Sequence, residues 1–302
     1  MSQDHSHQKH NHNHSHSHQI TKNIKLAFFL NLGFAILEIF GGLWTNSLAI
    51  ISDAVHDLGD SLSLGLAWYL EKASDKKSDL IFSYGYRRLS LLAALINTLI
   101  LLAGSLYVIS EAIPRLINPE PINAKGMILF AILGIAINTL AILKVFNKNS
   151  FNARIVALHL LEDVFGWVAV LIVSIALIFT DFYILDPILS ILIATYILYN
   201  ALAKLKKTTA LFLQAVPENI DIQKLEKSIL SLAKVDSIHH THVWSLDGEH
   251  HVLTTHVVVI NDTTREDIKS IKNTIQTLGQ NINLEHITVE IEYDNEHCYL
   301  RN

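Results

Sequence analysis

Two pairs of metal-binding residue types repeat the same spacing far apart in the chain. His56 is followed four residues later by Asp60, and His159 is followed four residues later by Asp163. Residues with this spacing share one face of a helix, with Cβ atoms about 5–6 Å apart, so each pair can hold one cation. Two imidazole nitrogens and two carboxylate oxygens suit tetrahedral Zn²⁺. The sequence therefore predicts one metal site made of both pairs.

A second spacing competes with this prediction. Asp53 and Asp57 are also four residues apart, and a site built on them would be all oxygen and would favour a harder metal such as Mn²⁺. We favour the His-x3-Asp spacing because it alone recurs in the second stretch. Asp53 then lies one turn from His56, where it suits a place beside the metal's access path or just outside the ligands. Glu162 points away from the ligand face.

The composition is that of a membrane protein. Of the 302 residues, 50% are hydrophobic and 17% charged, and the mean hydropathy is +0.33, whereas about a quarter of a soluble domain is charged. The net charge of −5 leaves no basic stripe for phosphates, which argues against nucleic acid as a partner. Cys298 is the single cysteine beside 17 histidines. This excludes a disulfide framework within the chain and favours a borderline metal such as Zn²⁺ over Cu(I).

Six apolar segments must position the two pairs. They cover residues 26–45, 48–70, 89–113, 126–146, 155–180 and 182–203, and each is near the ~20 residues that a spanning helix needs. The pairs fall in the second and fifth segments. Ionisable side chains inside a bilayer are costly and usually mark an ion path, which favours a metal site over two hydrogen-bonded pairs. Three amides that also fall inside segments, Asn31, Asn97 and Asn138, are predicted to hydrogen-bond between helices.

The basic residues predict the orientation of these segments. Lys and Arg gather at residues 22–25, 72–88, 144–154 and 204–207, whereas the alternate connections hold only Arg115 and Lys125. By the positive-inside rule, the basic side is cytoplasmic. Both termini are therefore expected in the cytoplasm, and the second and fifth segments are expected to run antiparallel.

The two ends of the chain differ from its middle. Residues 1–20 hold His at nearly every second position from His5 to His18, and we expect a disordered tail that collects metal weakly and no signal peptide. After residue 207, helices are predicted over 218–233 and 264–278 and strands over 253–260 and 286–293, with another strand before a hairpin turn at Asp247-Gly248. This α-β-β-α-β order predicts a small α+β domain with a three-stranded sheet. The expected parts are the tail (1–20), a six-helix membrane domain (21–207) and a cytoplasmic domain (208–302).

The chain resembles the cation diffusion facilitator family, specifically its zinc-transporting branch. The matching stretches are residues 46–56 (Asn-Ser-Leu-Ala-Ile-Ile-Ser-Asp-Ala-Val-His) with Asp60, 84–88 (Tyr-Gly-Tyr-Arg-Arg), 111–116 (Glu-Ala-Ile-Pro-Arg-Leu), His159 with Asp163, and 242–246 (His-Val-Trp-Ser-Leu). The resemblance implies a homodimer in the bacterial cytoplasmic membrane that exports Zn²⁺, with Cd²⁺ and Co²⁺ as further candidates, in exchange for H⁺. It also implies a regulatory, dimerising domain of the metallochaperone-like, ferredoxin-like type at the C-terminus.

The resemblance implies a second metal site in that domain. Its family positions fall on His239, His256, Glu290 and Glu292, of which the two glutamates depart from a His and an Asp seen in some members. Zn²⁺ there would be a regulatory ligand, whereas in the membrane it would be the transported substrate. The alternative is that several histidines of this region are exposed strand residues without a metal.

Proton exchange follows from the intramembrane ligands themselves. A histidine binds metal only when neutral and an aspartate only when ionised, so a proton competes directly with Zn²⁺. Three rivals remain: a membrane metalloenzyme, an ATP-driven pump and a metal sensor that does not transport. The sequence has no HExxH pair for the first and no phosphate-binding loop for the second, and the chain is not expected to be an enzyme.

Overall fold

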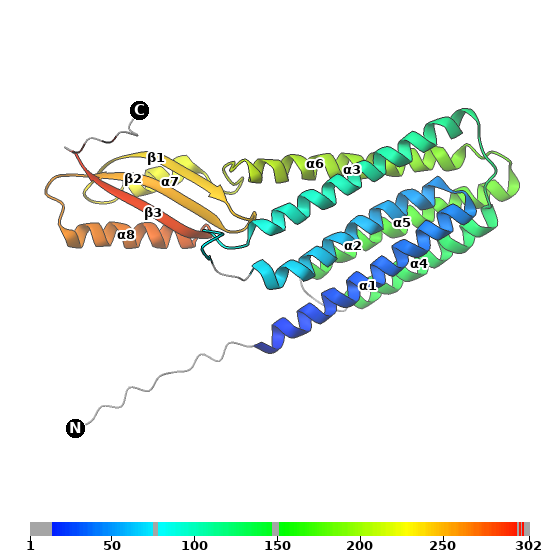
Figure 1. Cartoon of the computed structure of the whole chain (residues 1–302), viewed down its shortest axis with the longest axis horizontal. Helices are drawn as coiled ribbons and strands as arrows, with labels where there is room; N and C mark the ends of the chain where they lie inside the picture. Colours follow the sequence, from blue (N-terminus) through cyan, green and yellow to red (C-terminus); the bar gives the residue numbers. More distant parts are fainter. Residues whose placement is uncertain (1–13, 75–77, 147–150, 295, 297, 299–302) are drawn as a thin grey trace, which may run out of the picture. The chain divides into compact units, whose positions relative to one another are not determined.

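Six long helices open the chain. The computed structural model describes residues 14–74, 78–146, 151–294, 296 and 298. Residues 1–13 of the predicted tail lie outside them, whereas residues 14–20 are helical and begin α1, so the prediction of a disordered tail is corrected there. The helices are α1 (His14–Thr45), α2 (Leu48–Ser74), α3 (Arg88–Ile117), α4 (Ala124–Phe146), α5 (Phe151–Phe179) and α6 (Leu185–Phe212) (Figure 1). They are followed by α7 (Ile222–Leu230), β1 (Val235–Ser245), β2 (His251–Val259), α8 (Arg265–Gln280) and β3 (Leu284–Tyr293). The predicted fold class, six helices and then an α+β domain, is confirmed.

The helix that carries the first predicted pair is the least apolar of the six. Within the described residues, α1, α3, α4, α5 and α6 are each long and apolar enough to cross a membrane. α2 has 27 residues, which is also long enough, but it contains Asp53, Asp57 and Asp60. Charged residues are rare in spanning helices and mark functional positions. The one long helix that is not among these five, α2, is therefore the helix that carries the first predicted metal-binding pair.

The chain divides into two compact units, of which the first contains residues 1–69 and 97–201. Its core includes Phe34 of α1, Ile50 of α2 and Trp167 of α5. α4 and α5 pack closely because Gly134 has no side chain; a Cβ atom there would lie 2.3 Å from the Trp167 indole. Small residues of this kind let helix backbones approach one another in a bilayer.

Two of the three amides predicted to link helices do so. Asn97 of α3 donates to the Ser63 hydroxyl of α2 at 2.6 Å, and Asn31 of α1 donates to the backbone carbonyl of Asp57 at 3.2 Å. Asn138 instead donates to the Gly134 carbonyl of its own helix, at 3.2 Å, so that part of the prediction is corrected. Two of the amides thus hold neighbours of α2 against it.

The second unit contains residues 70–96 and 202–302, and its sheet has the order β1-β2-β3. β1 and β2 form an antiparallel hairpin and β3 runs parallel to β2. The hairpin turns at the predicted Asp247-Gly248, where Gly248 adopts φ +101°, a conformation that glycine adopts without strain. α7 is shorter than predicted because Asp221 caps it at its start.

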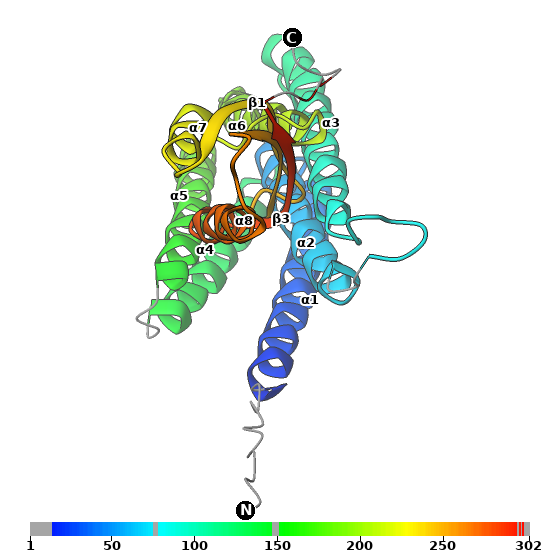
Figure 2. The same ribbon diagram turned by 90° about the vertical axis from the view of Figure 1, so that its left-hand side faces the viewer.

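The helices α7 and α8 pack on one face of the sheet. Leu253 and Val257 of β2 lie in a common core with Ile229 of α7 and Ile275 of α8, and Figure 2 shows α7 and α8 on the same side of the sheet. Successive strand residues point to opposite faces, so His256 points to the face opposite α7 and α8. We call this the open face.

Candidate metal sites

Three of the four side chains predicted for the intramembrane site converge. Nε2 of His56 lies 3.8 Å from Oδ2 of Asp60, one turn along α2, and 3.8 Å from Oδ1 of Asp163 on α5. Ligand atoms on a tetrahedral Zn²⁺ with bonds of about 2.0–2.1 Å lie about 3.3 Å apart, so these atoms need to close by only about 0.5 Å to share an ion. The His56 and Asp60 side chains are 25% exposed and that of Asp163 is 10% exposed. The group is therefore shielded but reachable by an ion.

The fourth predicted ligand, His159, belongs to α5, but its side chain lies outside the described part of the structure. The register of α2 against α5 still locates its backbone. A Cβ atom at Gly166 would lie 3.7 Å from Oδ1 of Asp53, and Asp163 lies beside His56. Residue numbers therefore rise along α2 in the direction in which they fall along α5. The two helices are antiparallel, as predicted. Residue 53 thus pairs with 166 and residue 56 with 163. One turn further along, residue 159 of α5 lies level with Asp60 of α2.

The competing pair is buried beside the proposed ligands. Asp53 and Asp57 are each 7% exposed; Asp53 lies beside Gly166 of α5, and Asp57 interacts with Glu38 of α1. Glu38 is completely buried. The histidine-containing site is favoured over an all-oxygen site because His56 lies within 3.8 Å of both Asp60 and Asp163. Glu162 is exposed, which agrees with its predicted direction.

A side chain from α6 holds the start of α2, and the sequence analysis missed it. Asp186 is fully buried and accepts hydrogen bonds from the Ser47 hydroxyl at 2.6 Å, the Leu48 N–H at 2.8 Å and the Ala49 N–H at 3.3 Å. The first N–H groups of a helix lack partners inside it, and a carboxylate satisfies them and complements the helix dipole. Asp186 therefore fixes the end of the helix that carries His56. An Asp at the start of an apolar segment was the only signal of this in the sequence.

Asp186→Ala should lower the free energy of unfolding by about 2–4 kcal/mol, because it leaves several buried donors without an acceptor. Thermal unfolding of the purified protein in detergent measures this. Asp186→Asn should recover part of the loss, since its amide oxygen still accepts. Asp181→Ala is the matched control, because Asp181 is exposed in the same connection. Equal stability of the Asp181 and Asp186 alanine variants would contradict the capping role.

A second group of ligand types lies on the open face of the sheet. His239 of β1, His256 of β2, Glu292 of β3 and Cys298 each offer one atom, and these atoms all lie within 4.8 Å of one another. The sequence analysis had named the first three but not Cys298. The other residue that it named, Glu290, has a side chain that is 65% exposed and lies 3.4 Å from Nε2 of His256. Glu292 and Cys298 approach Nδ1 of the same ring, at 2.5 and 3.6 Å.

The carboxylate of this group is kept ionised. Burial of Glu292, which is 6% exposed, opposes its ionisation. Hydrogen bonds from His256 and Cys298 and the charge of His239 outweigh burial and hold its pKa below the usual value. The pKa of the neighbouring His240 is also lowered, by burial and then by the surrounding histidines His242, His256 and His239. The shift at Glu292 favours the ionised carboxylate, which is the form that binds metal.

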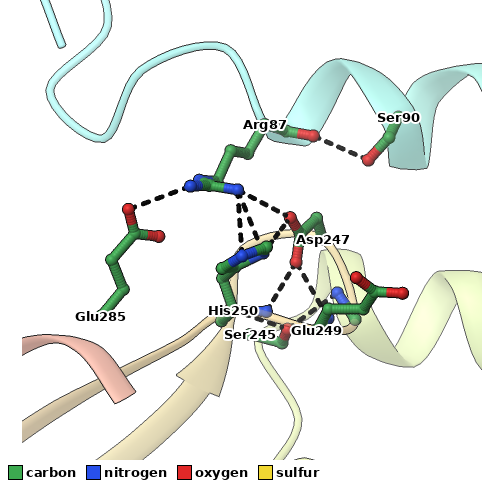
Figure 3. Close-up of polar contacts among 8 residues, drawn as sticks. Arg87, Ser90, Ser245, Asp247, Glu249, His250 and Glu285 are labelled. Carbon is green, nitrogen blue, oxygen red and sulfur yellow. Dashed lines mark hydrogen bonds and ion pairs between the residues drawn. The ribbon is translucent and has the colours of Figure 1, made fainter. Parts of the chain in front are cut away.

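Arg87 forms a junction between the segment before α3 and the β1–β2 hairpin, both in the second unit (Figure 3). Its guanidinium lies 3.0 Å from Oε1 of Glu285, 3.6 Å from Oδ2 of Asp247 and 3.1 Å from the His250 ring. Burial opposes ionisation of Asp247, but the N–H groups of His250 and Glu249 and the His250 ring hold its pKa below the usual value. The residue directly before α3 is thus fastened to the sheet. Nothing in the sequence predicted these partners.

Arg87→Ala should loosen this junction. Partly exposed ion pairs are worth about 1 kcal/mol or less each, so hydrogen exchange of the amides at residues 84–87 should accelerate about fivefold in the full-length protein. Arg88→Ala is the matched control, since the neighbouring Arg88 makes none of these contacts. Unchanged exchange in the Arg87 variant would show that the junction contributes nothing.

The comparisons with known proteins agree with both parts of the fold. Residues 24–213 match the family described as "Cation efflux transmembrane domain", and residues 217–294 match "Cation efflux protein, cytoplasmic domain". The chain is 32% identical over 275 residues to the "Cadmium, cobalt and zinc/H(+)-K(+) antiporter" of Bacillus subtilis, which covers 90% of this chain and 88% of the antiporter.

Two further relatives are similar to nearly the same extent. The "Zinc transporter ZitB" of Pectobacterium atrosepticum is 32% identical over 305 residues, 99% of this chain and 92% of the relative. The "Metal cation efflux system protein CzcD" of Cupriavidus metallidurans is 32% identical over 274 residues, 90% of this chain and 86% of the relative. With two family matches that span most of the chain, these similarities show that the chain belongs to the cation efflux family of multi-pass membrane transporters.

Proposed function

We propose that this chain exports divalent metal ions from the cytoplasm in exchange for protons, with Zn²⁺ as the first substrate and Cd²⁺ and Co²⁺ as further substrates. The observation that carries the proposal is the approach of His56, Asp60 and Asp163 between the antiparallel helices α2 and α5. His159, level with Asp60 on α5, is proposed as the fourth ligand. Two nitrogens and two oxygens match the tetrahedral preference of Zn²⁺.

Exchange for protons follows from competition at these same side chains. Zn²⁺ binds neutral imidazole and ionised carboxylate, so a proton that reaches His56 or Asp163 opposes metal binding. If the site opens in turn to each side of the membrane, protons that enter from outside displace the ion outward and are released when the next cytoplasmic ion binds. The partial exposure of His56 and Asp60, 25% each, is consistent with access from water.

Orientation and assembly complete the proposal. Basic residues on one side of the spans place both termini and residues 208–302 in the cytoplasm of a bacterial cell, with the protein in the cytoplasmic membrane. The division into residues 1–20, 21–207 and 208–302 belongs to this proposal. The match of residues 217–294 to the cytoplasmic domain of cation efflux proteins supports assembly as a homodimer through this region. We propose transport without catalysis, because the relatives carry transporter names.

Uptake into proteoliposomes tests the proposal. The purified protein is reconstituted, an inside-acidic pH gradient is imposed, and entry of Zn²⁺, Cd²⁺, Co²⁺ and Mn²⁺ is followed with a trapped fluorescent indicator. We expect Zn²⁺ uptake that stops when the gradient is collapsed and that alkalinises the lumen. Absence of uptake with retained metal binding would support the sensor or enzyme rival and contradict transport.

A further inference from the structure

We propose that Cys298 is a zinc ligand of this protein, and that it completes with His239, His256 and Glu292 a four-coordinate site that regulates rather than transports. The resemblance to the family implied Glu290 at this place and gave no role to the cysteine. This inference goes beyond metal export, because its ligands are separate from the intramembrane group and include the single thiol of the chain.

The four candidate ligand atoms lie close together. Nδ1 of His256 lies 2.5 Å from Oε1 of Glu292 and 3.6 Å from Sγ of Cys298, and Nε2 of His239 lies 3.4 Å from Oε2 of Glu292. Among the described residues, Oε2 of Glu292 is buried and accepts no hydrogen bond, and Nε2 of His239 is buried and has no hydrogen-bond partner. Buried polar atoms almost always have a partner. A cation held between them would satisfy both.

A β-bulge aims His239 into the group. The register of β1 against β2 shifts between His239, which pairs with His256, and His242, which pairs with Thr254. β1 thus has one more residue than β2 in this interval, and His240 in the bulge adopts φ +52°. In a regular strand, residues three apart point to opposite faces, whereas the extra residue brings both to the same face. A non-glycine residue held at positive φ costs free energy and is common at functional sites.

Glu290 then acquires a role outside the ligand shell. Its carboxylate lies 3.4 Å from Nε2 of His256, the nitrogen that faces away from Glu292 and Cys298. When Nε2–H donates to Glu290, the lone pair of Nδ1 faces the metal. Metal-binding histidines commonly donate their second N–H to a carboxylate, which fixes the tautomer. Glu290 is therefore a positioning residue for His256.

The ligand set suits a closed zinc site. Four protein ligands leave no position for a reacting water, which distinguishes structural and regulatory zinc sites from catalytic ones. A thiolate strengthens binding of Zn²⁺ relative to Mg²⁺ and Mn²⁺. Three ligands come from the three strands and the fourth from the chain after β3, so bound zinc would tie the C-terminal segment to the open face.

Cobalt titration of the full-length protein in detergent tests the assignment. Because Cys298 is the only cysteine, a near-ultraviolet sulfur-to-cobalt charge-transfer band can arise from no other residue. We expect this band at one Co²⁺ per chain, its loss in Cys298→Ser, and its displacement by Zn²⁺. His256→Gln and Glu292→Gln should each weaken cobalt binding at this band at least tenfold, and Glu290→Gln should weaken it by about 10–100-fold while preserving the band.

Two further measurements separate this inference from the transport proposal and from misfolding. Asp60→Ala should keep the charge-transfer band although it abolishes transport. Zn²⁺ should slow alkylation of Cys298 by iodoacetamide in the unmodified protein, which requires no variant to fold. Absence of the band in the unmodified protein, one Co²⁺ per two chains, or a band that is unchanged in His256→Gln and Glu292→Gln would overturn the site.

Discussion

Replacing Asp60 or Asp163 by alanine should abolish metal export. Each carboxylate approaches His56 within 3.8 Å, and each would contribute one of the negative charges that neutralise Zn²⁺. Changing a residue outside the ligands of a metal already costs about 10–100-fold in affinity, so losing a direct anionic ligand should reduce transport by at least about 100-fold. The measurements are zinc uptake in proteoliposomes and zinc resistance of cells that lack other exporters.

Two neighbouring carboxylates provide matched controls for these variants. Glu162→Gln removes a charge one residue before Asp163 on an exposed position, and transport should be nearly unchanged. Asp57→Asn should be far milder than Asp60→Ala, because Asp57 interacts with Glu38 of α1 and is not one of the proposed ligands. If Asp57→Asn were as inactive as Asp60→Ala, the site built on Asp53 and Asp57 would replace the proposed one. Wild-type zinc resistance with Asp163→Ala would contradict the intramembrane site altogether.

The intramembrane group was predictable because a helix converts sequence spacing directly into proximity. His56 and Asp60 meet on one face whatever surrounds them, and charged residues in apolar segments must turn toward a partner. The approach of Asp163 to His56 requires that their helices be neighbours and antiparallel. The basic residues at the segment ends predicted the antiparallel orientation, and the recurring His-x3-Asp spacing predicted that the two helices meet. The order of helices and strands after residue 207 was predictable for the same reason, from local periodicity and the Asp247-Gly248 turn.

Contacts that depend on packing were not predictable. The partners of Asp186 lie on another helix, far away in sequence, and no spacing rule connects them. Cys298 follows the last strand, so the direction of its side chain depends on how the chain leaves the sheet. Glu290 lies on the same face as His256 but approaches Nε2 of its ring, whereas Glu292 and Cys298 approach Nδ1. The bulge at His240 shifts the face of residues Ser237 to His239 relative to the rest of β1, and strict alternation would have misplaced His239.

Replacing His56 by aspartate should shift metal preference from Zn²⁺ toward Cd²⁺ and Mn²⁺. The exchange makes the site more anionic and richer in oxygen, and oxygen ligands suit harder ions with larger and more flexible coordination spheres. Nitrogen at about 2.0–2.1 Å in a tetrahedral frame is what favours Zn²⁺. The ratio of Zn²⁺ to Mn²⁺ uptake should fall about tenfold or more, which corresponds to about 1.4 kcal/mol of differential binding.

Competition uptake in vesicles measures this ratio, and His56→Asn separates a change in selectivity from a loss of affinity. The amide removes the imidazole without adding a charge, so it should weaken transport of all metals and leave their order largely unchanged. The aspartate variant instead should gain Mn²⁺ and Cd²⁺ transport relative to the asparagine variant, because only it supplies a third carboxylate beside Asp60 and Asp163. An unchanged ratio with preserved flux in His56→Asp would mean that the His56 ring does not touch the transported ion, and that its 3.8 Å approach to both aspartates serves packing alone.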